Sequence, residues 1–258
     1  MDLSGRHALV CGASKGIGRA TAHALAARGA EVTALARSGE ALESLTTELQ
    51  ASGATARSLV ADLDDHDGLL AAVDALLEQA GPVHILVHNT GGPAGGPLLS
   101  APAGALRAAF HRHVLSAHQL LQRLLPGMQE AGYGRMINVL STSVYEPIPN
   151  LGVSNTTRAA MAAWAKSVSR ELPSGITINN VLPGFTDTGR LAALKAGIAS
   201  RTGKPEADVH AGWLAQVPEG RLARPEETAA AIAFLASPDA AYIRGVSLPV
   251  DGGRLRGI

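Results

Sequence analysis

Short apolar runs alternate along the chain with longer stretches rich in alanine and leucine. The apolar runs predict strands at residues 7–10, 31–36, 54–60, 83–88, 135–140, 176–181 and 246–250. The intervening stretches predict helices at 19–28, 39–51, 65–79, 98–128 with an interruption near Pro102, 154–172 and 226–236. Such alternation is typical of an α/β fold, here a three-layer, Rossmann-type, doubly wound parallel sheet of about seven strands. No linker or repeat divides residues 1–258, so we expect a single domain.

Residues 186–217 interrupt this alternation. The stretch is irregular or helical, contains Gly189, Gly197, Gly203 and Gly212, and lies outside the predicted strands. It is a candidate substrate lid. Right-handed crossovers place every strand's carboxyl end at one edge of the sheet, where ligands bind. Chemistry is therefore expected in the stretches that follow the strands.

Composition narrows the possible partners. The 22 basic and 22 acidic residues balance, so no net positive field favours nucleic acid or an acidic membrane surface. No apolar run reaches the length of a membrane span, and the first residues lack the apolar core of a signal peptide. The single cysteine, Cys11, excludes an internal disulfide framework and is expected to be a small core residue. We expect a cytoplasmic protein that acts on a small molecule.

A glycine-rich turn follows the first predicted strand. It comprises Gly12, Ser14, Lys15, Gly16, Ile17 and Gly18, and a helix and a second strand come after it. A strand, glycine turn and helix place free backbone N–H groups and a helix N-terminus at a phosphate. This complete unit predicts a nucleotide-phosphate site.

Several motifs in order give the chain its resemblance to the short-chain dehydrogenase/reductase family, and to bacterial 3-oxoacyl-carrier-protein reductases within it. Residues 11–18 are similar to the family's TGxxxGxG turn, and residues 250–253 match its C-terminal signature. Residues 137–141 are similar to the strand that ends at the catalytic serine. The resemblance covers essentially the whole chain and implies a dimer or tetramer. It also implies cofactor contacts at Asp62, Leu63, Asn89, Gly91, Pro183, Gly184, Thr186 and Thr188.

The end of the second predicted strand bears on which cofactor is bound. An acidic residue there would bind the free ribose 2′-hydroxyl of NAD. Here Ala36 is followed by Arg37, and Lys15 lies in the glycine turn. Two cations without a carboxylate favour a 2′-phosphate, hence NADP(H). The alternative is that both are ordinary solvated charges.

The family uses an Asn-Ser-Tyr-Lys tetrad, in which tyrosine donates the proton and lysine lowers its pKa and holds the nicotinamide ribose. By the family's spacing, only Ser141 matches. Ser154 and Arg158 stand at the Tyr-x-x-x-Lys positions, and His113 stands at the asparagine position. A serine hydroxyl is a far weaker acid than a phenol of pKa about 10. Arg158 can bind a ribose but, being always protonated, cannot relay a proton.

Two other residues are candidates for the missing acid. Tyr145 lies in the loop after the fifth predicted strand, and the alternative is that it covers the pocket wall. His113 has a side chain that titrates near neutrality, and the alternative is a packed helix histidine. A metal site is not expected, because His111 and His113 point to different helix faces.

Competing functions remain open from the sequence. The first is an NADP(H)-dependent oxidoreductase with a non-standard active site that reduces a carbonyl or an imine, or a 3-oxoacyl thioester with Tyr145 or His113 as acid. An iminium ion would suit the first because hydride addition neutralises it without a proton. The alternative is a non-redox NADP(H)-binding protein, or a lyase or isomerase, that has lost dehydrogenase chemistry.

Overall fold

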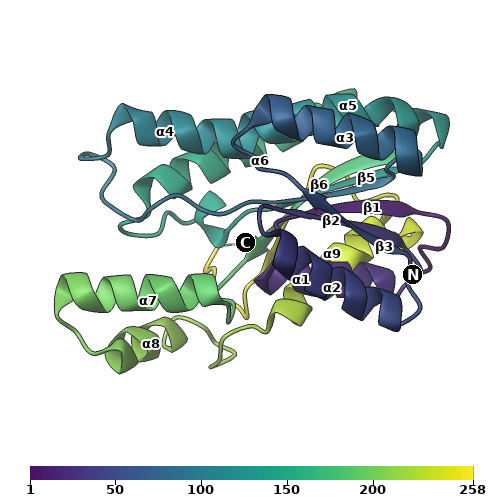
Figure 1. Ribbon diagram of the computed structural model, residues 1–258. Coiled ribbons are helices and arrows are strands. Elements are labelled where there is room, and N and C mark those ends of the chain that lie inside the picture. Colours follow the sequence, from purple (N-terminus) through teal and green to yellow (C-terminus); the bar gives the residue numbers. More distant parts are fainter. Residues whose placement is uncertain (258) are drawn as a thin grey trace.

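A parallel sheet of seven strands runs through the centre of the computed structural model, which describes residues 1–257 (Figure 1). The strand order is β3-β2-β1-β4-β5-β6-β7. The strands are β1 (His7–Cys11), β2 (Glu31–Ala36), β3 (Ala56–Val60), β4 (Ile85–Asn89), β5 (Gly134–Val139), β6 (Ile176–Pro183) and β7 (Ser247–Val250). Strand order reverses between β1 and β4, which confirms the predicted doubly wound fold and places the ligand crevice at that switch point.

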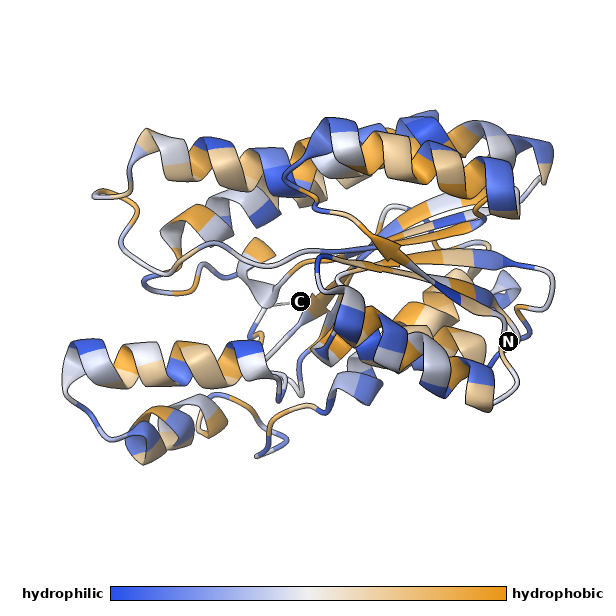
Figure 2. Cartoon of the chain, viewed as in Figure 1, coloured by the Kyte–Doolittle hydropathy of each residue, from blue (hydrophilic) through white to orange (hydrophobic). Residues whose placement is uncertain are grey.

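Helices cover both faces of the sheet. Figure 1 shows α3, α5 and α6 on one face and α1, α2 and α9 on the other. The helices are α1 (Gly16–Ala26), α2 (Gly39–Ala51), α3 (His66–Ala80), α4 (Ala103–Phe110), α5 (Ser116–Glu130), α6 (Gly152–Glu171), α7 (Gly189–Thr202), α8 (Glu206–Leu214) and α9 (Pro225–Ala236). Their apolar residues face the largely apolar strands (Figure 2).

Strand β1 shows how the sequence builds two apolar layers. Ala8 and Val10 pack into the layer beneath α1, α2 and α9, whereas Leu9 and Cys11 pack into the layer beneath α3, α5 and α6. Successive side chains of a strand point to opposite faces, so a continuous apolar run is what a strand covered on both sides requires. Burial raises the pKa of the Cys11 thiol to about 12, which confirms the prediction of a core residue.

The interruption predicted near Pro102 is confirmed, but the helical prediction over residues 98–128 was wrong for the residues before Pro102 and for a segment between α4 and α5. Helix α4 begins only at Ala103, because Pro102 occupies its N-cap in an extended conformation and disfavours helix in the residue before it. Between α4 and α5 the chain then forms a π-helical segment, His111–Leu115. A π-turn carries one extra residue per turn and often marks a functional site. Apolar periodicity alone does not reveal such a segment.

Helices α7 and α8 occupy the region predicted to be a lid. They project beyond the sheet in Figure 1, and α7 buries none of its side chains. The pair is attached where Phe185 stacks on Trp213 with ring centroids 5.3 Å apart. Low burial is typical of elements that move, which is compatible with a lid. The lid role itself stays a prediction. Across residues 1–257, no helix combines the length and apolar character that crossing a membrane requires.

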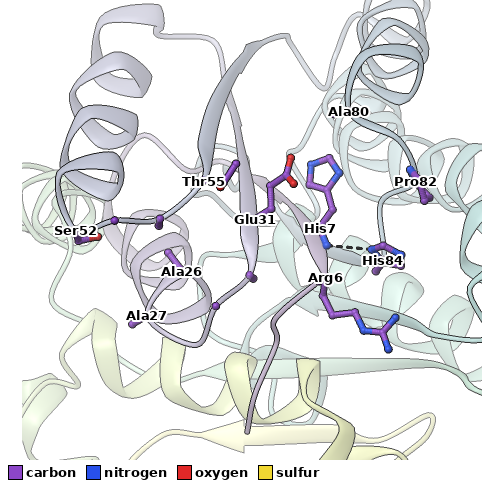
Figure 3. Close-up of a pocket in the computed structure, with 15 residues that line it drawn as sticks. Arg6, His7, Ala26, Ala27, Glu31, Ser52, Thr55, Ala80, Pro82 and His84 are labelled. Atoms are coloured by element: carbon purple, nitrogen blue, oxygen red, sulfur yellow. Dashed lines mark hydrogen bonds between the residues drawn. The ribbon is translucent and has the colours of Figure 1, made fainter.

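A hollow of about 800 Å³ lies at the edge of the sheet where the strands begin (Figure 3). Arg6, His7, Glu31 and His84 line it, and the His7 backbone N–H donates to His84 Nδ1 over 3.0 Å. The glycine turn follows the carboxyl end of β1, so this hollow belongs to the opposite edge. The candidate site is therefore located by its side chains and turns rather than by this cavity.

Candidate functional site

The glycine turn after β1 has a shape that only glycine permits at two positions. Gly12 has φ +63°, and a Cβ there would lie 2.6 Å from the Asn89 carbonyl oxygen. A Cβ on Gly18 would lie 2.2 Å from the Gly12 carbonyl oxygen. Asn89 Nδ2 donates to that same Gly12 oxygen over 3.4 Å. The turn is thus packed directly against the end of β4, at the switch point of the sheet.

The N-terminus of α1 is open to a ligand. Lys15 is the N-cap residue, its side chain makes no capping hydrogen bond, and the first turn holds no acidic residue. The first backbone N–H groups of a helix lack internal acceptors and, with the helix dipole, favour an anion. A Cβ on Gly16 would lie 3.1 Å from Thr188 Cγ2, so the turn faces the segment that leads into α7. Residues far apart in sequence therefore flank the N-terminus of α1.

Arg37 and Asp62 meet beyond the carboxyl ends of β2 and β3. Arg37 Nη1 lies 3.8 Å from Asp62 Oδ2, and the side chains are 75% and 41% exposed. A pair this open to water contributes little to stability. Both side chains, with Leu63 beside them, therefore remain available to a ligand at the positions where the sequence places the adenosine end of the cofactor.

The π-helical segment brings His113 to the loop after β4. His113 is buried, and its Nδ1 shares a hydrogen bond with Thr90 Oγ1. Its Nε2 is buried without a hydrogen-bond partner among the described residues. The segment is anchored from the β3 side by an ion pair between Arg112 and Asp64. A buried, unpaired ring nitrogen at this place is available to a ligand or a water.

His113 stays neutral throughout the physiological range. Burial, and after it the charge of Arg158, lowers the pKa of His113 to about 2. Burial likewise lowers the pKa of His88 to about 3, and His88 Nε2 lies 2.9 Å from Ser116 Oγ. A neutral imidazole has no imidazolium proton to donate. The structure therefore argues against His113 as the acid and favours a hydrogen-bonding role.

We expect these two histidines to make the protein acid-sensitive. Their pKa values are lowered on folding from 6.5, so the unfolded chain binds more protons below that pH. The free energy of unfolding is therefore highest above about pH 6.5. It decreases as the pH is lowered, by about 2 kcal/mol per histidine at pH 5. His113→Asn should reduce the loss in unfolding free energy between pH 7 and pH 5, measured by urea unfolding, by about 2 kcal/mol. His210→Asn, in α8, is the control, and equal pH dependence in wild type and His113→Asn would contradict the assignment.

Ser141, Ser154 and Arg158 gather at the carboxyl end of β5. Arg158 Nη1 donates to the carbonyl oxygens of Val139, at 3.0 Å, and Leu140, at 2.9 Å. Its Nε donates to Ser154 Oγ over 3.4 Å, within α6. Ser141 Oγ accepts from the Ser143 backbone N–H over 3.1 Å. The guanidinium thus joins α6 to the strand end that carries Ser141, and the three predicted residues share one place.

Arg158 brings a buried positive charge to this cluster. Burial, followed by repulsion from Arg190, lowers the pKa of Arg158 to about 10. The group is therefore still charged at neutral pH. A buried cation whose charged neighbour is another cation attracts negative charge, including charge that develops on a substrate.

Tyr145 turns toward the far strand of the sheet. Its side chain is 56% exposed, and its hydroxyl donates to the Ser247 carbonyl oxygen over 3.2 Å. This contact occupies the phenolic proton with a backbone acceptor of β7. The arrangement favours a residue of the pocket wall, and the acid role stays a prediction that mutation can decide.

We expect Tyr145→Phe to keep turnover within about fivefold of wild type, because one exposed hydrogen bond contributes about 1 kcal/mol or less. The measurement is kcat for whichever substrate consumes NADPH, with Tyr242→Phe, another exposed tyrosine, as the control. Loss of turnover by a hundredfold or more would instead make the Tyr145 phenol the acid.

The loop after β6 lies at the same edge of the sheet as the glycine turn, since both follow the carboxyl ends of parallel strands. A Cβ on Gly184 would lie 2.9 Å from the Asp251 Cα, so the loop packs on the C-terminal segment. Thr186 Oγ1 donates to the Gly184 carbonyl oxygen over 3.4 Å. Thr188 caps α7 by accepting from the Leu191 backbone N–H over 3.3 Å. With Pro183 at the end of β6, the predicted cofactor residues of this loop all lie between the sheet and α7.

Three contributors were missed from the sequence. Thr90 orients His113, Arg190 Nη2 donates to the Pro93 carbonyl oxygen over 2.8 Å, and Arg254 Nη1 donates to Thr142 Oγ1 over 2.8 Å. Arg254 thereby ties the C-terminal segment to the loop of Ser141. These pairs are 23, 97 and 112 residues apart, and no local pattern signals them. Within residues 1–257, no group of three histidine, cysteine or carboxylate side chains is placed to hold a metal ion.

Comparison with known proteins agrees with this geometry. A family model described as enoyl-(acyl carrier protein) reductase matches residues 12–254. The 3-oxoacyl-[acyl-carrier-protein] reductase FabG of Vibrio cholerae is 36% identical over 256 residues, which cover 98% of each chain. The chain belongs to the short-chain dehydrogenase/reductase family. It is accordingly an oxidoreductase of a family that uses NAD(P).

Solved structures of family members share the whole fold. YwfH, an NADPH-dependent reductase involved in bacilysin biosynthesis, superposes with a TM-score of 0.94 at 28% identity and covers 99% of this chain and 100% of its own. L-Sorbose reductase of Gluconobacter frateurii, solved with NADPH and L-sorbose, superposes with a TM-score of 0.93 at 28% identity. The match covers 100% of this chain and 99% of the sorbose reductase chain. Both of these similar proteins bind or use NADPH.

Proposed function

We propose that this chain is an NADP(H)-dependent short-chain reductase with a non-standard active site, which reduces a carbonyl or imine group of a small molecule. The observation that carries the proposal is the placement of Arg158. Its guanidinium is buried against the strand end that bears Ser141, and its α6 neighbour one turn earlier is Ser154 rather than a phenol.

The residues present fit the cofactor. The glycine cradle, the uncapped start of α1 and Lys15 suit a pyrophosphate, and Arg37 suits a 2′-phosphate. Asp62 and Leu63 would hold the adenine end, and the loops of Asn89, Gly91, Pro183, Gly184, Thr186 and Thr188 would hold the nicotinamide end. When bound, NADPH supplies a hydride. The use of NADPH by two similar proteins supports the same choice here.

Ser154 limits which substrates suit the site. An alkoxide formed from a simple ketone must be protonated, and a serine hydroxyl does this poorly. An iminium carbon that accepts a hydride gives a neutral amine, so the reaction balances without a proton. For a carbonyl substrate, Ser141 would donate a hydrogen bond to the oxygen, and a water held at His113 Nε2 would supply the proton. We therefore place iminium substrates first and activated carbonyls second.

Arg158 would stabilise the reaction electrostatically. A fixed charge in a buried site acts strongly on charge that develops in the transition state. Arg158 Nε and Nη1 already donate hydrogen bonds to Ser154 and to the end of β5, and these bonds hold the guanidinium in place before substrate binds. Its role would be to stabilise negative charge on the substrate, without moving a proton.

The test is NADPH consumption, followed at 340 nm, across matched panels of cyclic imines, ketones and aldehydes. We expect turnover that is faster for iminium substrates than for ketones. Tight NADPH binding with no turnover on any compound would refute the reductase and favour the non-redox alternative. Preference for simple ketones would refute the argument from Ser154.

Cofactor choice gives a separate prediction. Arg37→Gln should raise the Kd for NADPH by about tenfold to a hundredfold, because it removes a charged hydrogen bond to the 2′-phosphate. The Kd for NADH should stay within about twofold. Fluorescence titration of both cofactors measures this, with Arg201→Gln on α7 as the control. Equal weakening of NADPH and NADH would contradict a phosphate contact at Arg37.

A further inference from the structure

Two arginines from different helices converge on Gly92, in the loop after β4. Arg158 comes from the buried middle of α6, and Arg190 comes from the first turn of α7. The point where a Cβ on Gly92 would stand is 2.9 Å from Arg190 Nη2 and 3.6 Å from Arg158 Nη2. The absence of a side chain at position 92 thus leaves room for both guanidinium groups beside one loop.

Neither of these arginines has an acidic partner. Among residues 1–257, no carboxylate lies within ion-pair distance of Arg158 or Arg190. The charge that acts on Arg158 is that of Arg190, which is repulsive. Other arginines of the chain, such as Arg112 with Asp64 and Arg221 with Glu227, are paired. Two adjacent cations without a counter-charge are costly where water is scarce, and an anion would relieve that cost.

Hydrogen-bond donors remain free at the same point. Arg158 uses Nε and Nη1 on the protein, and its Nη2 has no acceptor among the described residues. Arg190 Nη2 donates a hydrogen bond to the Pro93 carbonyl oxygen, whereas its Nε and Nη1 have no acceptor among the described residues. Each guanidinium carries five N–H donors in a planar fork that matches a carboxylate. After burial, the charges of both arginines lower the pKa of His113, which places its ring near them. Its buried Nε2 also has no hydrogen-bond partner among the described residues.

We propose that Arg158 and Arg190 form an anion subsite that binds a carboxylate of the substrate, so the enzyme acts on a small organic acid. The inference rests on the proposed reductase function and names its substrate class. The cofactor phosphates have their own place at the glycine turn and Arg37, over β1 and β2, whereas this subsite lies over the ends of β4 and β5. Arg190 lies on α7 and already contacts the loop of Gly92, so a bound acid would add a second link between that helix and the loop.

The test measures binding to the NADPH-saturated protein, so that the cofactor phosphates are already in place. Ligand-observed NMR titration compares three matched pairs: acetate with acetamide, butyrate with butyramide, and benzoate with benzamide. At least one acid should bind about tenfold or more tightly than its amide. Arg190→Gln should remove that preference without changing the affinity of the amide. Arg201→Gln, in the last turn of the same helix, should keep it.

Each outcome bears on the proposal separately from catalysis. Equal binding of acid and amide in all three pairs overturns it, as does a preference that survives Arg190→Gln. A carboxylate preference that depends on Arg190, found in a protein that never oxidises NADPH, would support the subsite while refuting the reductase. Turnover of neutral imines with no carboxylate preference would support the reductase while refuting the subsite.

Discussion

Arg158→Met abolishes most of the reduction while NADPH still binds. We expect kcat to fall by about 10²–10³-fold, the usual cost of removing one preorganised group that stabilises developing negative charge. The variant also loses three hydrogen bonds of the guanidinium, two to the end of β5 and one to Ser154 within α6. The measurement is steady-state turnover on the best carbonyl substrate of the panel, on whose oxygen negative charge develops, with the Kd for NADPH from fluorescence titration.

Two companion variants separate the charge from the packing. Arg158→Lys keeps a cation and should retain more activity than Arg158→Met by at least tenfold. Arg170→Met changes an exposed arginine at the end of the same helix and should leave kcat unchanged. If Arg158→Met keeps wild-type turnover and melts normally, Arg158 takes no part in catalysis and the proposed electrostatic role is wrong.

Ser154→Tyr combined with Arg158→Lys should convert the site into an efficient ketone reductase. The pair supplies a phenol of pKa about 10 with a cation one helical turn away, and a positioned general acid contributes about 10²–10⁴-fold. We expect kcat/KM for simple ketones to rise by that order, while turnover of iminium substrates, which need no proton, does not rise.

The matched control is Ser154→Phe combined with Arg158→Lys, which has the same bulk without the hydroxyl. Ketone reduction should not rise above the wild-type level in that variant. A rise of equal size in both double variants would show that pocket shape, not proton donation, limits the wild-type protein. No rise in the tyrosine variant would mean that the wild type already has an adequate proton source.

Much of the fold follows from local pattern. A strand covered by helices on both faces is buried at every position, as β1 and β5 are, and is therefore largely apolar. Apolar runs such as residues 8–11 are visible without coordinates. The phosphate turn is visible for a similar reason, since Gly12 and Gly18 fill places where a side chain would collide with backbone. The limits of helices were less clear, and the π-helical segment at His111–Leu115 was missed because the residues on both sides of it were interpreted as one continuous helix.

The site depended more on long-range contacts. The sequence places Ser141, Ser154 and Arg158 by spacing, and the structure brings them to one strand end. Sequence spacing could not show that burial keeps His113 neutral or that Tyr145 bonds to Ser247, because both depend on neighbours from other elements.

The sequence by itself determined the doubly wound fold and the glycine cradle, because each depends on residues close together in the chain. It also predicted, by spacing, which residues stand at the catalytic positions. Only the tertiary structure decided the charge environment. Arg158 and Arg190 are 32 positions apart in sequence, and they meet at Gly92 because the parallel sheet brings the loops after β4 and β6 to the same edge as α6. Electrostatic interaction depends on distance in space and on burial, and neither is encoded in the local order of residues.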